Sequence, residues 1–447
     1  MPICLLTNPV VNHNMLAKYL IERGVECYAY IDMDQVNKLP PTVKSRGRDF
    51  DVDLYAGVIM SKDDLPPPND CPFHAVIPGG ELGVESADQI SAYYGLPGND
   101  PETIDYRRDK QAMQNRLAEV GLPSISSMSI GPETKSSEIE ETLGVGPYVL
   151  KPHDAAGGEA LHYCADLSAL ESAIADLAWG ELNCTWKQNH RFVVQKYISG
   201  LEYVVDLVAR DGEIVVAAIS RYIRLSDLGY WSYPNVKRFL VMEDPSDPKF
   251  ESLIAQAVAC CHALGLRQGS AHMEFIDGAQ GCFMVEVGAR LHGSLSPSLF
   301  AECYENDLLG SLYESYFVSD TPLRSGRLRK YGLRSFIAAE EAGVLNTIEP
   351  SLMERISSNS SLIAKSITFE AGETFPQTRD EVHTPASGFF ANASLSQLFK
   401  DVWDFDYILN QYFNGKQYEV GAMAEWINAP TKLSAASKTL DRLGELK

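Results

Sequence analysis

Short apolar runs alternate with amphipathic segments at the start of the chain. Residues 3–7 form an apolar run that predicts a buried strand, and residues 13–23 predict a helix. Residues 26–31 predict a second strand. This order is typical of a β-α-β unit, so we expect the first hundred or so residues to fold as a small α/β domain.

The apolar run at residues 75–78 is followed by Gly79-Gly80 and by a predicted helix over residues 81–94. Such strand-to-helix turns are places where α/β domains bind ligands. No G-x-G-x-x-G follows the first strand, and no G-x-x-x-x-G-K-[ST] occurs in the chain. These absences argue against the two common nucleotide-binding motifs.

The middle of the chain predicts a mixture of helices and strands. An apolar stripe at helical spacing predicts a helix over residues 106–120. Strands are expected at residues 148–152 and 160–164, joined by a loop that contains two glycines. The next helix should begin with the capping box Ser168-x-x-Glu171.

Further strands and two hairpins predict a mostly antiparallel sheet. Asp211-Gly212 and Asp277-Gly278 are strong hairpin signals. The pattern restarts near residue 331 with short strands and an amphipathic helix around residues 395–405, which predicts a separate C-terminal domain. The strands of the expected sheet are residues 192–198, 201–209, 213–220, 270–276 and 282–287.

Composition and charge narrow the classes of partner. The 447 residues are 45% hydrophobic and 22% charged, as in ordinary globular proteins, and the net charge is −22. This charge repels nucleic acid and anionic lipid, so we expect neither as a partner. No apolar run reaches the length of a membrane span, no basic leader opens the chain, and the nine cysteines form no C-x-x-C pair. We therefore expect a cytoplasmic protein with reduced thiols.

The predicted hairpin of residues 270–287 carries two acidic positions. If it is centred on Gln280, Glu274 lies opposite Glu286. Like charges in directly opposite positions destabilise a sheet by up to about 1 kcal/mol unless a cation lies between them. Mg²⁺ bound to a nucleotide suits such carboxylates. The alternative is a solvated hairpin face, since a shift of one residue breaks the pairing.

The same register places polar side chains around the two glutamates. His272 would face Gly288, and Ser270 would face Arg290 if the strand continues that far. Cys282, Met284 and Glu286 would share one side of their strand. Arg290 is then a candidate charge stabiliser, with an ordinary surface cation as the alternative. For His272 the alternative is a histidine satisfied within the core or at its rim.

Two lysines and a glycine loop are candidate phosphate ligands. Lys110 lies in the apolar stripe of its helix, and Lys151 lies in an otherwise apolar strand. Each could bind an anion or extend its ammonium to solvent. Gly157-Gly158 lies in the loop between two predicted strands, where backbone N–H groups could approach phosphates. A plain flexible turn is the alternative.

Taken in order, these motifs resemble a known family. The motifs are R-R-D-K at Lys110, V-L-K-P at Lys151 followed by Gly157-Gly158, V-V-Q-K-Y-I-S-G-L-E-Y over residues 193–203, H-M-E-F from His272, and V-E-V-G-A-R ending at Arg290. This order resembles the ATP-grasp superfamily, and within it the L-amino acid ligases that form dipeptides. The segments P-G-G-E-L-G-V-E and G-L-P-G-N add to that likeness.

The resemblance implies an α/β and α+β architecture. The fold would be an ATP-grasp fold with an N-terminal Rossmann-like α/β domain at residues 1–104 and a C-terminal α+β domain, similar to that of L-amino acid ligases, at residues 321–447. Residues 105–190 and 191–320 would form two subdomains with the ATP cleft between them, and the second subdomain would carry the metal site.

The resemblance also implies roles for individual residues. Lys110 and Lys151 would bind phosphates under the Gly157-Gly158 loop, and Arg290 would steady the substrate carboxylate and the tetrahedral intermediate. Lys151, Glu274 and Arg290 form the expected catalytic set. The residues expected at adenine are Gln195, Lys196, Tyr197 and Ile198, with Glu202 at ribose, and Glu274 and Glu286 at Mg²⁺, for which Mn²⁺ could substitute.

One departure from the family concerns the metal site. Many members carry Asn two residues after the second metal glutamate, where this chain has Gly288. His272 or a water molecule could fill the gap. The absence of this asparagine also motivates an alternative function, that of a nucleotide-binding regulator without catalysis.

The implied activity is an ATP-dependent carboxylate–amine ligase acting through an acyl phosphate. Two L-amino acids are the expected substrates, and another carboxylate or amine is the alternative. Glu81, Glu85 and Asp88 share a helical face that could bind an ammonium group or could simply be solvated. The glycine loop and residues 222–235 are expected to close over the site. A homodimer is common among such enzymes, but the oligomeric state is not readable from this sequence.

Overall fold

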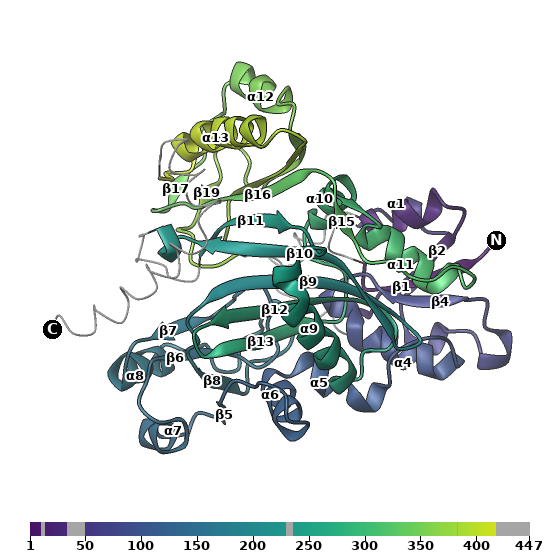
Figure 1. Cartoon of the computed structure of the whole chain (residues 1–447), viewed down its shortest axis with the longest axis horizontal. Coiled ribbons are helices and arrows are strands. Elements are labelled where there is room, and N and C mark those ends of the chain that lie inside the picture. The colour runs from purple at the N-terminus through teal and green to yellow at the C-terminus, as the bar shows by residue number, and fades with distance from the viewer. Residues whose placement is uncertain (10–13, 34–49, 229–235, 382, 417–447) are drawn as a thin grey trace.

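The computed structural model describes residues 1–9, 14–33, 50–228, 236–381 and 383–416, and its elements are shown in Figure 1. The N-terminal part forms a parallel sheet of order β3-β2-β1-β4, with every pair parallel. This is the α/β unit that the first apolar runs predict. Its elements are β1 (Ile3–Thr7), α1 (Met15–Ile21), β2 (Glu26–Tyr30), β3 (Gly57–Ile59), β4 (Ala75–Pro78) and α4 (Val84–Tyr94).

Two N-terminal helices differ in extent from the sequence expectation. The helix expected over residues 13–23 is α1, and residue 13 lies outside the described part. The helix expected over residues 81–94 begins as a separate 3₁₀ turn, Glu81–Gly83, before α4. Gly83 permits this turn to pack tightly, because a Cβ there would lie 2.1 Å from the backbone oxygen of Thr7.

The predicted helix over residues 106–120 is two helices. These are α5 (Asp105–Arg108) and α6 (Lys110–Glu119), separated by Asp109 in an extended conformation. The Asp109 carboxylate accepts hydrogen bonds from the N–H groups of Gln111 and Ala112 and so caps α6. The apolar period runs through the break, so periodicity alone could not locate it.

A small antiparallel sheet of order β5-β8-β6-β7 follows. Helices α7 and α8 pack on it around a core that includes Tyr148 and Phe192. The expected capping box is wrong: α8 is capped by Asp166, whose carboxylate accepts from the N–H of Ala169. The bounds are β5 (Ser127–Ile130), α7 (Ser136–Leu143), β6 (Tyr148–Pro152), β7 (His162–Cys164), α8 (Leu167–Ala175) and β8 (Phe192–Lys196).

The central sheet has eight strands in the order β13-β12-β9-β10-β11-β16-β20-β18. Helix α9 packs on one face with α6, while α10 and α11 pack on the other. The elements are β9 (Leu201–Arg210), β10 (Glu213–Arg224), β11 (Lys237–Glu243), α9 (Glu251–Ala263), β12 (Gly269–Gly278), β13 (Gly281–Gly288), α10 (Ser296–Cys303), α11 (Leu308–Phe317), β16 (Tyr331–Ile337), β18 (Leu362–Ile367) and β20 (Ala386–Asn392).

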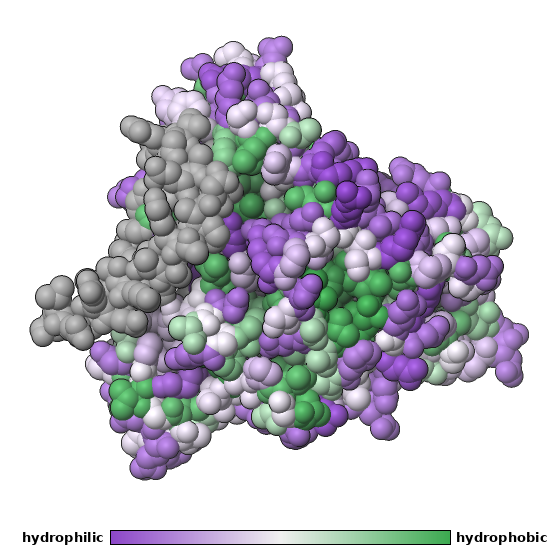
Figure 2. Space-filling view, viewed as in Figure 1, coloured by the Kyte–Doolittle hydropathy of each residue, from purple (hydrophilic) through white to green (hydrophobic). Residues whose placement is uncertain are grey.

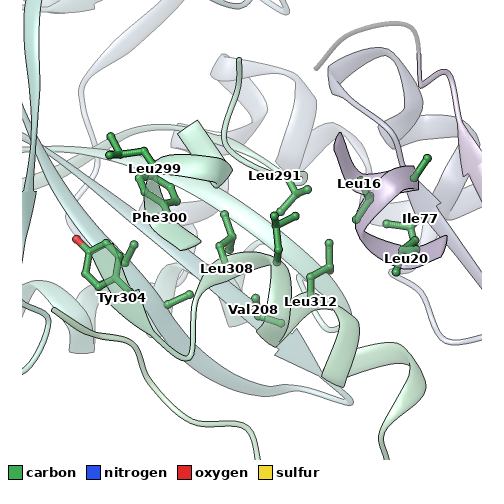
Figure 3. Close-up of a cluster of buried hydrophobic side chains, with 14 of the residues drawn as sticks. Leu16, Leu20, Ile77, Val208, Leu291, Leu299, Phe300, Tyr304, Leu308 and Leu312 are labelled. Carbon is green, nitrogen blue, oxygen red and sulfur yellow. The ribbon is translucent and has the colours of Figure 1, made fainter. Parts of the chain in front are cut away.

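One hydrophobic cluster joins the N-terminal unit to this sheet. Figure 3 shows Leu16 and Leu20 of α1 beside Leu312 of α11 and Val208 of β9. Leu16 is 7% exposed and the other three side chains are inaccessible to solvent. Burying a leucine side chain contributes about 1.5–3 kcal/mol, so this cluster ties the two parts together.

Three C-terminal strands, β16, β20 and β18, extend the central sheet, and the short strands of residues 343–344 and 374–375 pair in a small sheet of their own. They still pack a hydrophobic cluster of their own, in which α13 buries Leu398, Phe399, Val402 and Phe405. The amphipathic helix expected from the sequence is thereby confirmed. The remaining elements are β14 (Tyr304–Glu305), β15 (Arg327–Leu328), β17 (Gly343–Val344), α12 (Pro350–Ser357), β19 (Thr374–Phe375) and α13 (Leu395–Tyr412).

The surface is mixed in character. On the face in Figure 2, hydrophilic residues dominate the outer edges and hydrophobic ones gather in patches nearer the middle. Among the described residues, none of the helices has both the length and the apolar composition that a membrane span requires.

Candidate functional site

A cleft lies between the small sheet and the central sheet. It is lined by α6, β6, the glycine loop, β9, β12 and β13, and also by Glu81 and by residues 380–381 of the C-terminal part. Segments far apart in the sequence therefore meet at one place. The cleft includes Lys110, Lys151, Gly157, Gly158, Glu202, His272, Glu274, Glu286 and Arg290.

The two predicted lysines are buried and approach the cleft from different elements. Lys110 opens α6, and its Nζ donates a 2.6 Å hydrogen bond to the Ala155 oxygen in the glycine loop. The same Nζ lies 3.2 Å from Oε2 of Glu286. Lys151 is 4% exposed, and burial lowers its pKa to about 8 although the Glu286 charge opposes this shift. A buried ammonium is stabilised by an anion such as phosphate.

The glycine loop is anchored at its base. The N–H of Lys110 donates to the His153 oxygen at 3.0 Å, and Nδ1 of His153 lies 2.8 Å from Oδ2 of Asp109. Burial alone would raise the pKa of Asp109, but hydrogen bonds from His153 and backbone N–H groups hold it at about 2. Gly157 and Gly158 adopt φ of 68° and 73°, the left-handed region where glycine is unstrained.

The acidic pair on the hairpin has the predicted register at the cleft. Glu274 pairs with Glu286, and His272 pairs with Gly288. Nearer the turn the pairing shifts by one residue, because Val285 forms a bulge on β13. The turn is therefore Ala279-Gln280 rather than a loop centred on Gln280.

Because of this bulge, the side chains of β13 do not alternate between the two faces of the sheet as the sequence predicts. Met284 lies in the hydrophobic core, whereas the neighbouring residues Val285 and Glu286 both line the cleft. Glu286 thus does not share a side with Met284, and the expectation that it would do so, along with Cys282, is wrong. A regular strand would have placed Glu286 in the core, so the bulge is what delivers this carboxylate to the cleft.

The expected partnership of Ser270 with Arg290 is also wrong. Strand β13 ends at Gly288, and the N–H of Arg290 donates back to the Gly288 oxygen at 2.8 Å. Arg290 reaches the cleft from the turn that follows the strand. There its Nε donates to Oε2 of Glu81 at 2.7 Å.

Each metal-site candidate carboxylate contacts a cation of the protein. Glu274 lies 3.2 Å from Nζ of Lys237 and 3.5 Å from Nε2 of His272. Burial would raise the pKa of Glu274, but Lys237 and His272 hold it well below its usual range. The two glutamates therefore offer carboxylate oxygens on adjacent strands, a donor set that fits Mg²⁺.

The absence of a side chain at position 288 has a steric reason. A Cβ on Gly288 would lie 3.2 Å from Oε2 of Glu81 and 3.2 Å from Cζ of Arg290. The Glu81–Arg290 ion pair therefore occupies the space that an asparagine would need. His272 lies directly opposite on β12, as the register predicts.

The residues expected at adenine do not line the described cleft, although their strand pairs with the strand of Lys151. Gln195 and Lys196 end β8, and Tyr197 and Ile198 follow directly. Nε2 of Gln195 is buried without a hydrogen-bond partner among the described residues. A buried amide of this kind suits a ligand acceptor such as a purine nitrogen. Their role at adenine stays a prediction.

Glu202 lies in the cleft at the start of β9 and contacts Arg224. Burial raises the pKa of Glu202, while the Arg224 charge opposes this shift. Its expected role at ribose stays a prediction.

The acidic face before the first lysine is paired with cations. Glu81 contacts Arg108 as well as Arg290. Glu85 contacts Lys187, and Asp88 lies 2.8 Å from Nη2 of Arg107. A solvated acidic face is therefore wrong for Asp88, which is 4% exposed. Binding of a substrate ammonium by Glu81 or Glu85 stays a prediction, and it would have to compete with these ion pairs.

Sequence reasoning missed the part that Lys237 and Glu381 play. Lys237, at the start of β11, lies 3.5 Å from Oε2 of Glu381, which comes from an irregular C-terminal segment. Nη1 of Arg334 donates to Glu381 at 2.9 Å. Burial would raise the pKa of Glu381, but Lys237 and Arg334 lower it to about 2. No motif marks these residues, because their partners are distant in the sequence.

Comparison with known proteins agrees with this geometry. A family model described as an ATP-grasp domain matches residues 145–298, which include the glycine loop, Glu274, Glu286 and Arg290. This segment of the chain is similar to ATP-grasp domains. The family resemblance inferred from the ordered motifs is confirmed.

Two curated relatives match about half of this chain. Dapdiamide A synthase of Enterobacter agglomerans is 29% identical over 246 residues, which is 54% of this chain and 56% of that protein. The L-arginine-specific L-amino acid ligase of Bacillus subtilis is 22% identical over 234 residues, which is 50% of this chain and 52% of that protein. The match thus spans little more than half the length of these relatives.

A solved structure matches over nearly the whole chain. The L-amino acid ligase from Bacillus licheniformis superposes with a TM-score of 0.68 at 14% identity, covering 92% of this chain and 98% of that one. At this identity the likeness concerns the fold. The ATP-grasp fold with an α/β unit before it and mixed strands and helices after it is therefore confirmed, while the four domain boundaries stay predictions.

Proposed function

We propose that this protein is an ATP-dependent carboxylate–amine ligase that joins two L-amino acids through an amide bond. The observation that carries the proposal is the convergence of two buried lysines with two glutamates in one cleft. Phosphate groups would pair with the lysines, and a divalent cation would pair with the glutamates. The ligase names of the two relatives and of the structural neighbour support the reaction class.

In this proposal different residues of the chain bind different parts of Mg-ATP. Lys110 and Lys151 would bind phosphates beneath Gly157-Gly158, and Glu274 with Glu286 would hold Mg²⁺ or Mn²⁺. The bound cation would supply neutralisation of charge on the transferring phosphoryl group. Binding of adenine beside β8 and of ribose by Glu202 completes the assignment.

The reaction would proceed in two balanced steps. A substrate carboxylate oxygen attacks the γ-phosphorus, the bond to ADP breaks, and an acyl phosphate forms. The amine of the second substrate then attacks the acyl carbon, releases inorganic phosphate and loses a proton to give the amide. Arg290, held at the cleft by Glu81, would stabilise the negative oxygen of the tetrahedral intermediate. Orientation of the amine supplies much of the rate.

Closure over the site belongs to the same proposal, since acyl phosphates hydrolyse in water. The glycine loop lines the cleft directly. Of the second expected lid, residues 222–235, the last seven lie outside the described residues.

A second candidate is another ATP-grasp ligase that uses a different carboxylate or amine. The two relatives carry different names, dapdiamide A synthase and L-arginine-specific L-amino acid ligase, which supports different substrates among related ligases. A nucleotide-binding regulator without catalysis is the third candidate, motivated by Gly288. A homodimer and a cytoplasmic location stay predictions.

The test is phosphate release from Mg-ATP across amino acids supplied singly and in pairs, with product masses. ADP formation that requires two amino acids and yields their mass minus water supports the proposal. Turnover with one amino acid and a different acid or amine supports the second candidate. Nucleotide binding without turnover for any pair supports the regulator.

A further inference from the structure

Three buried side chains converge beside Glu274 without a role in the proposed chemistry. Asp206 lies on β9, His272 on β12, and His292 in the turn after β13. Their exposed fractions are 0%, 7% and 2%. Within the described part of the chain they are the one group of three such residues whose candidate ligand atoms all lie within 4.8 Å of one another.

The three groups that meet, two imidazoles and one carboxylate, form a small triangle. Nδ1 of His292 lies 2.9 Å from Oδ2 of Asp206, and Nδ1 of His272 lies 3.4 Å from Oδ1. The two Nδ1 atoms lie 3.1 Å apart. Ligand atoms bound to one metal ion at about 2.0–2.2 Å are separated by about 3.0–3.5 Å. The triangle has the size of one face of a metal coordination shell.

Protons alone do not satisfy this triangle well. Nδ1–H of His292 can donate to Oδ2 of Asp206, and Nδ1–H of His272 can donate to Oδ1 of the same carboxylate. Two Nδ1–H groups would then lie 3.1 Å apart. A cation at the centre converts all three contacts into attractions.

The surroundings resemble the outer shell of a metal site. Nε2 of His272 lies 3.5 Å from Oε1 of Glu274, as when a metal-bound imidazole donates its other N–H to a carboxylate. The ring of His292 packs edge-on against Phe300, with centroids 5.1 Å apart, which fixes its orientation. Two imidazoles and one carboxylate suit first-row transition metals better than Mg²⁺.

We propose that Asp206, His272 and His292 bind one divalent first-row transition metal ion, separate from the Mg²⁺ expected at Glu274 and Glu286. The ion would tie β9, β12 and the turn that carries Arg290 into one unit. It would also hold His272 in place beside Glu274. The proposal rests on these three residues, here called the Asp206–His272–His292 triad, and does not require the ligase activity.

The first test is the metal content of the purified full-length protein, followed by titration of the chelator-treated protein with Zn²⁺ and Co²⁺. We expect about one equivalent of Zn²⁺ per chain and visible absorption bands of Co²⁺ bound by nitrogen and oxygen. Asp206→Asn and His292→Phe should each weaken Zn²⁺ binding by more than about 100-fold. Glu286→Gln is the matched control, because it removes a proposed Mg²⁺ ligand and leaves the triad intact.

The result of the titration of the wild-type protein does not depend on whether any of the variants folds. Absence of stoichiometric Zn²⁺ and of Co²⁺ bands in folded wild-type protein overturns the proposal. Equal Zn²⁺ affinity in wild type and in a folded Asp206→Asn or His292→Phe protein also overturns it. Loss of Zn²⁺ binding in Glu286→Gln would move the ion to the magnesium site and reject the triad. None of these outcomes depends on whether amino acids are ligated.

Discussion

At the scale of single residues, the two buried lysines differ in their partners. Lys110 is paired with Glu286 and with the Ala155 oxygen, whereas among the described residues no carboxylate lies within ion-pair distance of Lys151. Burial therefore dominates at Lys151 and lowers its pKa to about 8. A phosphate group would restore the favourable partner that this ammonium lacks.

The pH dependence of nucleotide binding should reveal Lys151. Below pH 8 its ammonium is already charged, so phosphate binds without proton uptake. Above pH 8 the free protein must take up a proton to bind, and ATP affinity should fall by up to about tenfold per pH unit. Fluorescence titration with ATP from pH 7 to 10 measures this. Lys151→Arg, which stays charged, should flatten the profile, and an equally steep profile in that variant would contradict the assignment.

Turnover should depend on both a lysine and a glutamate of the cleft. Lys151→Ala removes a phosphate ligand, and Glu286→Gln removes a metal ligand and the partner of Lys110. Each should abolish ADP formation while circular dichroism stays unchanged. Asp277→Asn, at an exposed position of the same hairpin, is the control and should keep its activity. Wild-type rates in either cleft variant would reject the site.

The sequence predicts a cleft residue correctly where a charged side chain interrupts an apolar pattern. Lys110 and Lys151 interrupt apolar stripes, and both are buried at the cleft. Lys237 and Glu381 interrupt no pattern. They become visible only when strands distant in the sequence are placed side by side.

At the scale of elements, the hairpin shows why register is difficult to predict. The pairing of Glu274 with Glu286 follows from alternation and an assumed turn. The actual turn is shorter by one residue, and the Val285 bulge compensates for the difference. Apolar residues lie on both sides of this strand, so the sequence gives no sign of where alternation breaks.

The C-terminal segment that carries Glu381 should influence the metal site through Lys237. This ammonium lies between Glu274 at 3.2 Å and Glu381 at 3.5 Å. In Glu381→Gln, Lys237 would pair more strongly with Glu274 and compete with Mg²⁺. We expect the Mg²⁺ concentration for half-maximal nucleotide binding to rise several-fold, whereas Glu341→Gln, at an exposed position, should leave it unchanged. An unchanged Mg²⁺ requirement in Glu381→Gln would disprove this coupling.

A buried ion pair joins the central sheet to the last described helix. Arg238 of β11 lies 2.8 Å from Asp406 of α13, and the two side chains are 3% and 2% exposed. Asp406→Ala would leave the Arg238 charge buried without its carboxylate and should lower the free energy of unfolding by about 3–5 kcal/mol. Asp404→Ala, which breaks a pair with the exposed Arg355, should cost about 0–1 kcal/mol. Urea denaturation measures both, and equal losses would contradict the argument.

At the scale of the whole molecule, three parts of the chain supply one cleft. The α/β unit brings Glu81 to Arg290, the ATP-grasp segment brings the lysines and glutamates, and the C-terminal part brings Glu381. The order of motifs along the chain predicts the family and the fold, because each motif needs its own strand or loop. The contacts between the parts could not be predicted, since Glu81 and Arg290 are 209 residues apart.

The central claim is that the cleft binds a magnesium nucleotide between its lysines and its glutamates. The most direct measurement is calorimetric titration of ATP into wild-type protein, Lys151→Ala and Glu286→Gln at several Mg²⁺ concentrations. We predict that Mg²⁺ strengthens binding to the wild type, that Lys151→Ala binds weakly at every concentration, and that Glu286→Gln loses the response to Mg²⁺. Equal binding by all three proteins, with or without Mg²⁺, would contradict the account.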